Sequence, residues 1–118
     1  MEDILKKKLI GEQLSSVEFV QDYLQIHFDD KNFIIYIWPI VYQDGNKYIF
    51  GESNFRNALC ELIGLDIKDV VFKESERLKI IFDTKNIIEI DLNSENPDIV
   101  SEIAIFNDTL DNSWSVFE

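Results

Sequence analysis

The sequence predicts an α+β fold, in which antiparallel strands form most of the structure and two short helices pack on the sheet. A repeat is the first observation: residues 9–34 recur as residues 62–88, with identity at 12 of 23 aligned positions, where unrelated sequences match at roughly one position in fifteen. Alternating apolar residues between tight-turn sequences are the second observation, because strands joined by hairpins pair antiparallel. We therefore expect one domain, 1–118, built from two pseudo-repeats of about 1–52 and 53–118, each a short helix followed by a β-meander.

Each unit begins with a predicted helix that a glycine ends. The first helix, residues 2–10, has three apolar residues on one side: Ile4, Leu5 and Leu9. Gly11 supplies its left-handed cap. Ser53 is the expected N-cap of the second helix, and Gly64 ends it. The apolar residues of the second helix recur at helical spacing: Phe55, Ala58, Leu59, Leu62 and Ile63.

Strands are predicted where apolar residues alternate with polar ones or run continuously between turn sequences. In the first unit they cover residues 14–19, 24–28, 33–38, 40–42 and 48–50. In the second unit they cover residues 67–73, 77–83, 87–92, 102–106 and 113–117. Asp29-Asp30-Lys31-Asn32 and its counterpart Asp83-Thr84-Lys85-Asn86 are tight-turn sequences, and Asp44-Gly45 marks another hairpin. The pattern leaves open one continuous sheet or two packed sheets.

The third strand distinguishes the two copies. One alternating set is apolar in both and is expected to face the core: Ile34, Tyr36 and Trp38 in the first copy, Ile88, Ile90 and Leu92 in the second. The other set changes character: Ile35 and Ile37 align with Glu89 and Asp91. The two units should therefore present different outer surfaces.

The charge is strongly acidic and unevenly placed. The net charge is −12, of which residues 1–59 carry −3 and residues 60–118 carry −9, and no basic residue follows Lys85. Such a surface repels phosphate, which disfavours direct nucleic-acid binding and favours a basic protein partner. Solubility alone is the competing interpretation. The candidate partner-binding residues are the acids of the second unit: Glu89, Asp91, Glu95, Asp98, Glu102, Asp108 and Asp111.

No catalytic, cofactor or metal motif accompanies the repeat. The chain has one histidine, His27, and one cysteine, Cys60, which is too few for a zinc site and does not form a nucleophile with a base. Its four glycines are isolated, so no phosphate-binding loop is present. Turn formation explains the Asp-rich and Asn-rich stretches better than calcium binding does. We expect a protein that is not an enzyme and uses no cofactor or metal.

The chain has the features of a cytoplasmic protein. With Cys60 alone no internal disulfide can form, which suits a reducing compartment. The longest apolar run, residues 33–42, is about ten residues long and contains Pro39, about half of what a membrane helix requires. We expect no membrane association.

Aromatic residues gather around Pro39. The cluster consists of Tyr36, Trp38, Tyr42, Tyr48 and Phe50. Core packing is the favoured interpretation, and an interface anchor is the functional one, because binding hot spots use aromatics beside charge. The apolar third strand, 33–38, also allows a second hypothesis, in which the chain is a structural domain that self-associates through this strand as a homodimer.

The overall pattern is similar to that of small bacterial immunity proteins of polymorphic toxin systems, including those of contact-dependent inhibition. The resemblance rests on Leu-Ile-Gly, Val-x-Phe and Leu-x-Ile-x-Phe-Asp, with Glu102-Ile-Ala-Ile-Phe and Trp114 near the C-terminus. It covers most of the chain and carries over no functional residue. It implies a cytoplasmic inhibitor that binds one cognate toxin domain, often a nuclease, and covers its active site or substrate-binding surface.

Overall fold

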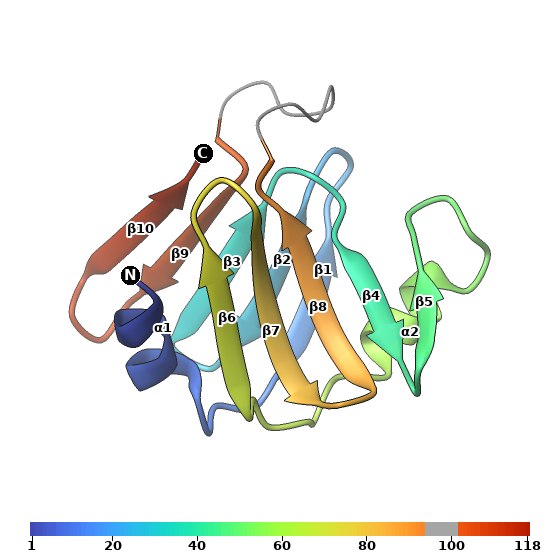
Figure 1. The fold of residues 1–118 in the computed structure, drawn as a ribbon, viewed down its shortest axis with the longest axis horizontal. Helices are drawn as coiled ribbons and strands as arrows, with labels where there is room; N and C mark the ends of the chain where they lie inside the picture. Colours follow the sequence, from blue (N-terminus) through green and yellow to red (C-terminus); the bar gives the residue numbers. More distant parts are fainter. Residues whose placement is uncertain (94–101) are drawn as a thin grey trace.

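Ten strands and two short helices make up the computed structural model, which describes residues 1–93 and 102–118 (Figure 1). Sheet 1 contains, in spatial order, β1 (Ser16–Phe19), β2 (Leu24–Phe28), β3 (Lys31–Ile35), β9 (Ala104–Asp108) and β10 (Ser113–Phe117). Sheet 2 contains β5 (Asn46–Tyr48), β4 (Ile40–Gln43), β8 (Asn86–Asp91), β7 (Arg77–Asp83) and β6 (Asp69–Lys73). The helices are α1 (Glu2–Leu9) and α2 (Phe55–Cys60). The fold is α+β, and both sheets are antiparallel throughout.

Each sheet takes strands from both halves of the chain. The meander β1-β2-β3 continues into the hairpin β9-β10, because β3 pairs with β9. The meander β6-β7-β8 continues into the hairpin β4-β5 in the same way, because β8 pairs with β4. The chain therefore crosses from one sheet to the other after β3 and again after β8, and it forms two sheets.

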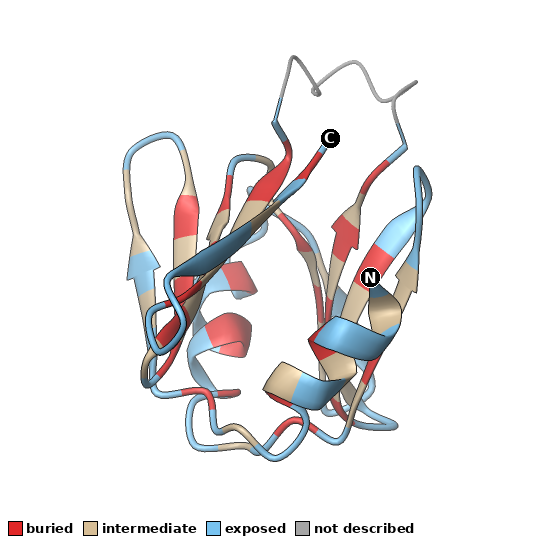
Figure 2. Ribbon diagram, turned by 90° about the vertical axis from the view of Figure 1, so that its left-hand side faces the viewer, coloured by how far each residue is buried: buried red, intermediate tan, exposed pale blue. Residues whose placement is uncertain are grey.

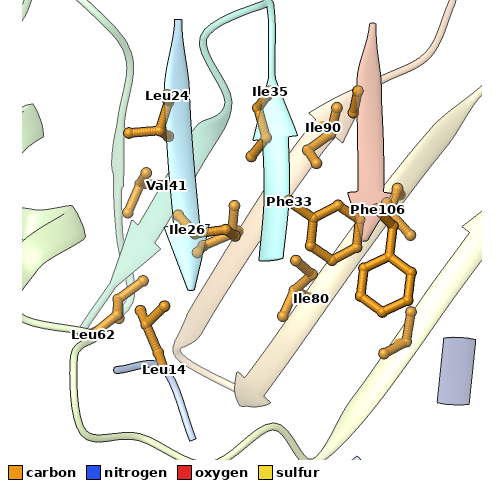
Figure 3. Close-up of a cluster of buried hydrophobic side chains, with 14 of the residues drawn as sticks. Leu14, Leu24, Ile26, Phe33, Ile35, Val41, Leu62, Ile80, Ile90 and Phe106 are labelled. Atoms are coloured by element: carbon orange, nitrogen blue, oxygen red, sulfur yellow. The ribbon is translucent and has the colours of Figure 1, made fainter. Parts of the chain in front are cut away.

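The core lies between the sheets. Along β2, β3 and β7 every second residue is buried, as expected for strands with one face turned inward. Phe33 packs on Phe106 with ring centroids 4.8 Å apart, and Ile80 and Ile90 come from the facing sheet (Figure 3). Figure 2 shows buried residues on strands of both sheets, which lie on either side of this interior. Burying a side chain of this kind contributes about 1.5–3 kcal/mol.

The helices lie at opposite ends of the two sheets (Figure 1). Helix α1 packs against β6, and α2 packs against β4 and β1. Leu5, Leu9, Phe55 and Leu59 are the buried anchors, all at 1% exposure or less. In the described ranges, neither helix has the length or the apolar character to span a bilayer.

Three helix details differ from the sequence prediction. Ile4 and Ile63 were expected on the apolar faces, but they are 53% and 41% exposed. Ile4 is one position before the buried Leu5, so its side chain points about 100° away from that of Leu5 around α1. Ile63 lies beyond the end of α2. The N-cap of α2 is Asn54 and not Ser53, and its side chain makes no capping hydrogen bond. In the turn before the helix, Phe55 N–H donates to the Glu52 carbonyl.

The predicted core face of the third strand is wrong in the first copy. Ile35 is fully buried, whereas Ile34 is half-buried and Tyr36 is 41% exposed. The cause is the preceding turn, which is Asp29-Asp30 and leaves Lys31 within β3. In the second copy the turn is Thr84-Lys85, one aligned position later, with a β-bulge before it. A slip of one residue exchanges the two faces of a strand.

Candidate partner-binding surface

Of the seven predicted acidic residues, the five that the structure describes do not lie together in one site. Glu89 and Asp91 lie on β8, and Glu102 is exposed just before β9. Asp108 and Asp111 lie at the β9-β10 turn, beside α1 and away from the end of β8 that carries Asp91 (Figure 1). Glu95 and Asp98 lie outside the described residues.

The outer face of sheet 2 carries charges of both signs. Glu89 lies opposite Lys79 of β7, with 3.7 Å between carboxylate and ammonium. Asp91 lies opposite Arg77 in the same ladder. Cross-strand pairs of this type stabilise a sheet by about 0.2–1 kcal/mol each. The two carboxylates therefore have cations of their own chain beside them and do not form a purely acidic face.

Asp108 and Asp111 are engaged by Lys8 of α1. The Lys8 Nζ lies 3.1 Å from Asp108 Oδ2 and 2.8 Å from Asp111 Oδ2, and it donates to Ser113 Oγ at 2.9 Å. The hydrogen bond from Lys8, together with that from Ser113, lowers the pKa of Asp111 to about 2. Asp108 is only 5% exposed. The structure thus uses these two carboxylates to hold α1 against the β9-β10 turn.

Three of the five aromatic residues around Pro39, namely Tyr36, Trp38 and Phe50, line a surface groove. This corrects in part the expectation that the cluster belongs to the core, against which Trp38 and Tyr48 do pack. None of the five is buried: Tyr36 and Phe50 are exposed, and Trp38, Tyr42 and Tyr48 are half-buried. β3 ends at Ile35, and residues 36–39 cross between the sheets. In this segment Tyr36 is exposed and Trp38 is half-buried, whereas Pro39 stays buried. The groove has a volume of about 520 Å³ and is lined by Tyr36, Ile37, Trp38, Ile40, Ile49, Phe50 and Asp91.

The aromatic groove is held in place by α2. Trp38 and Phe50 stack with ring centroids 4.1 Å apart and planes within 7°. Both rings meet Phe55 edge-on, and Phe55 is buried at the start of α2. Ile49 N–H donates to Glu52 Oε1 at 2.6 Å, which fixes the segment after β5. The groove walls are therefore ordered before any partner arrives, which reduces the entropy lost on binding.

A second hollow adjoins the aromatic groove. It has a volume of about 380 Å³ and is lined by Ile40, Glu76, Arg77, Glu89, Asp91 and Asn93. Ile40 and Asp91 belong to both hollows. Asp91 thus lines the aromatic groove, and Glu89 lines the adjoining hollow. A partner that covers both hollows would meet apolar rings and carboxylates.

Sequence reasoning missed the contribution of Ile49. The pattern predicted strand pairing through residue 50, but β5 ends at Tyr48 and leaves Ile49 49% exposed. Gly51, which adopts a φ of 100°, then turns the chain toward α2. The sequence did contain a signal for this exposure, because Gly51 directly follows Ile49 and Phe50. Glycine readily adopts a positive φ and weakens a strand, so a strand is expected to end near it.

Comparisons with protein-family models, with curated proteins and with solved structures found no match.

Proposed function

We propose that this chain is a binding protein that neutralises a basic protein partner, a toxin domain of the nuclease kind, by covering its active or substrate-binding surface. The exposed aromatic groove beside Glu89 and Asp91 is the observation that carries the proposal. The resemblance to bacterial immunity proteins supplies the class of partner. The single cysteine, which is exposed and unbridged, supports a cytoplasmic site of action.

The aromatic groove has the character of a binding hot spot. Tyr36, Ile49 and Phe50 expose 41%, 49% and 47% of their surface around a stacked tryptophan. Aromatic side chains in a preformed groove contribute most of the binding energy of many interfaces. We assign the affinity to these apolar contacts.

We assign the net charge of the whole molecule to the association rate and not to the affinity. Glu89 and Asp91 already face Lys79 and Arg77, so they add little affinity of their own. The net charge of −12 acts at longer range and attracts a basic surface. Charge of this kind raises the association rate and is screened by salt, with a Debye length of about 8 Å at physiological ionic strength.

The proposal is tested by co-expressing the chain with the product of the gene immediately upstream and purifying the complex. We expect a complex that silences a toxic activity and whose association slows as salt is raised. A chain that captures no partner at low salt, and protects no cell from that product, would overturn the proposal.

The variant Ile49→Lys tests the aromatic groove. We expect it to weaken binding at least about tenfold, or about 1.4 kcal/mol, through faster dissociation, because it places a charge among apolar contacts. Ile4→Lys is the matched control, since Ile4 is 53% exposed on α1 and both changes move the net charge equally. Surface plasmon resonance separates the two rates. Equal dissociation rates for the two variants would remove the groove from the interface.

We also infer that the two halves of the chain descend from one duplicated unit. The repeated sequence supports this inference, and so does the order of elements, in which a helix and five strands occur twice. Each meander receives the hairpin of the other half at the same position. The copies differ in their outer faces, and six of the seven residues that line the aromatic groove come from the first copy.

A further inference from the structure

Strand β10 is an unprotected sheet edge. It pairs with β9 alone, and its residues Ser113–Phe117 carry no charge. Edge strands offer unpaired backbone groups to other strands, and proteins usually block them with charged residues, proline or a covering element. No residue of β10 is charged or a proline, and the Lys8 ammonium of α1 reaches only its first residue, at Ser113 Oγ.

The other three edges formed by the described residues are blocked. β1 contains Glu18 and contacts α2. β6 contains charged residues at both ends and packs against α1, whose Glu2 Oε2 accepts the Phe72 N–H at 2.8 Å. β5 is three residues long and contains Lys47. The contrast marks β10 as the edge open to pairing.

Apolar side chains of β10 face solvent on the outer side of sheet 1. Trp114 is 69% exposed and Val116 is 41% exposed. Val116 lies opposite Ile105, which lies opposite Ile34 in β3, so an apolar row continues across three strands. A strand added at β10 would extend this row.

We propose that β10 pairs with β10 of a second copy of this chain, in an antiparallel arrangement about a twofold axis at Ser115. This register sets Trp114 of each copy opposite Val116 of the other. Aromatic and β-branched residues form favourable cross-strand pairs, and the small Ser115 faces itself on the axis. An isologous pair of this kind joins two sheets into one of ten strands and closes after two copies.

Electrostatics selects a second copy as the occupant. Two chains of charge −12 repel, so they associate best through a surface without carboxylates. β10 itself is uncharged, and of the two carboxylates that flank it, Asp111 is neutralised by Lys8 at 2.8 Å while Glu118 is exposed. A basic segment from another protein would find no carboxylate on β10 to pair with. The uncharged strand therefore matches itself better than it matches a cationic partner.

The third strand does not offer this contact. β3 lies between β2 and β9, so both of its backbone edges are already paired. We therefore place self-association by strand pairing at β10 and not at the third strand, where the sequence had suggested it. Two five-residue strands form a small interface, so we expect a dimer whose population rises with protein concentration. This inference does not depend on the proposed partner.

Light scattering during size-exclusion chromatography tests the dimer on the full chain. We expect the mass to rise with concentration from 13.9 kDa toward twice that value, and to rise further with added salt, which screens the repulsion. Val116→Lys should abolish the rise, because a lysine blocks an edge. Leu110→Lys, in the exposed turn before β10, is the charge-matched control and should still dimerise. A monomer at all concentrations, or a dimer unaffected by Val116→Lys, would overturn the proposal.

Cysteine cross-linking tests the register. In a Cys60→Ser background, Ser115→Cys places two thiols directly opposite each other across the axis, at about the separation that a disulfide spans. Ser113→Cys, two residues away on the same strand, would face Phe117. We expect oxidation to convert the Ser115→Cys variant to a covalent dimer much faster than the Ser113→Cys variant. Equal rates of cross-linking would refute this register.

Discussion

Lys8 joins the N-terminal helix to the last hairpin. Its hydrogen bond to Asp111, followed by that to Asp108, raises the pKa of Lys8, and the same contact lowers the pKa of Asp111 to about 2. The lowered carboxyl pKa stabilises the fold above about pH 4, and this contribution is lost as the pH falls toward 2. The raised ammonium pKa stabilises the fold, fully so below about pH 10.5. This contribution is lost as the pH rises through the raised pKa of Lys8.

We expect Lys8→Met to lower the melting temperature most between about pH 5 and pH 10, because both groups are charged in that window. The difference from the unchanged protein should shrink below about pH 4 and above about pH 10.5. Lys7→Met is the control, since Lys7 is exposed at the same helix end. Circular dichroism melts across the pH range give the answer. A difference that stays constant from pH 2 to pH 11 would show that Lys8 acts through packing alone.

At the scale of elements, the β4-β5 hairpin depends on Gly45. Asp44 and Gly45 form a two-residue turn with φ values of 52° and 84°, as the Asp-Gly sequence predicted. An added Cβ at Gly45 would meet nothing within 4 Å, so its cost is confined to the backbone. We expect Gly45→Ala to lower the free energy of unfolding by about 1–2 kcal/mol in urea titrations. Gly45→Asn should cost less, because asparagine tolerates this conformation. Equal losses of unfolding free energy in the two variants would show that the positive φ at Gly45 is not the source of the cost.

The elements were largely predictable from the sequence, whereas their pairing was not. Alternation and turn residues are local signals, and they located both helices and most strands within a few residues. The β3-β9 pairing joins Phe33 to Phe106, and no local pattern encodes a contact so distant in sequence. The position of the preceding turn decides whether Ile34 or Ile35 faces the core, and that turn is displaced by one residue. Because both residues are apolar, their type does not show which of them is buried.

The sequence did not show how the candidate site residues are grouped in space, for the same physical reason. Acidic residues were identified by their type, but Lys8 and Lys79 reach Asp111 and Glu89 only through tertiary packing. The aromatic groove forms where the chain crosses between sheets, so its exposure depends on the division into two sheets. Residue type indicated which side chains are acidic or aromatic. The topology of the two sheets determined which of these residues lie on the same surface.

At the scale of the whole molecule, the exchange of hairpins makes the two halves interdependent. Sheet 1 needs β9 and β10 to complete it, and sheet 2 needs β4 and β5. A fragment of residues 1–52 would expose the β3 edge and the inner faces of Phe33 and Ile35, which the second half covers. We expect that neither fragment 1–52 nor fragment 53–118 folds alone. A mixture of the two fragments should regain the circular dichroism spectrum of the intact chain.

The same interdependence predicts one cooperative transition for the intact chain. Trp114 lies in sheet 1, while Trp38 lies at the entry to sheet 2, so Trp38→Phe and Trp114→Phe leave one fluorophore in each region. Because each sheet contains strands from both halves, we expect the two variants to show fluorescence and circular dichroism transitions that coincide within each protein. Separate transitions, or a fragment 1–52 that melts cooperatively by itself, would mean that the halves are independent units. In that case the crossing segments would act as linkers, and the aromatic groove formed by one of them would lose the rigid support that its binding role requires.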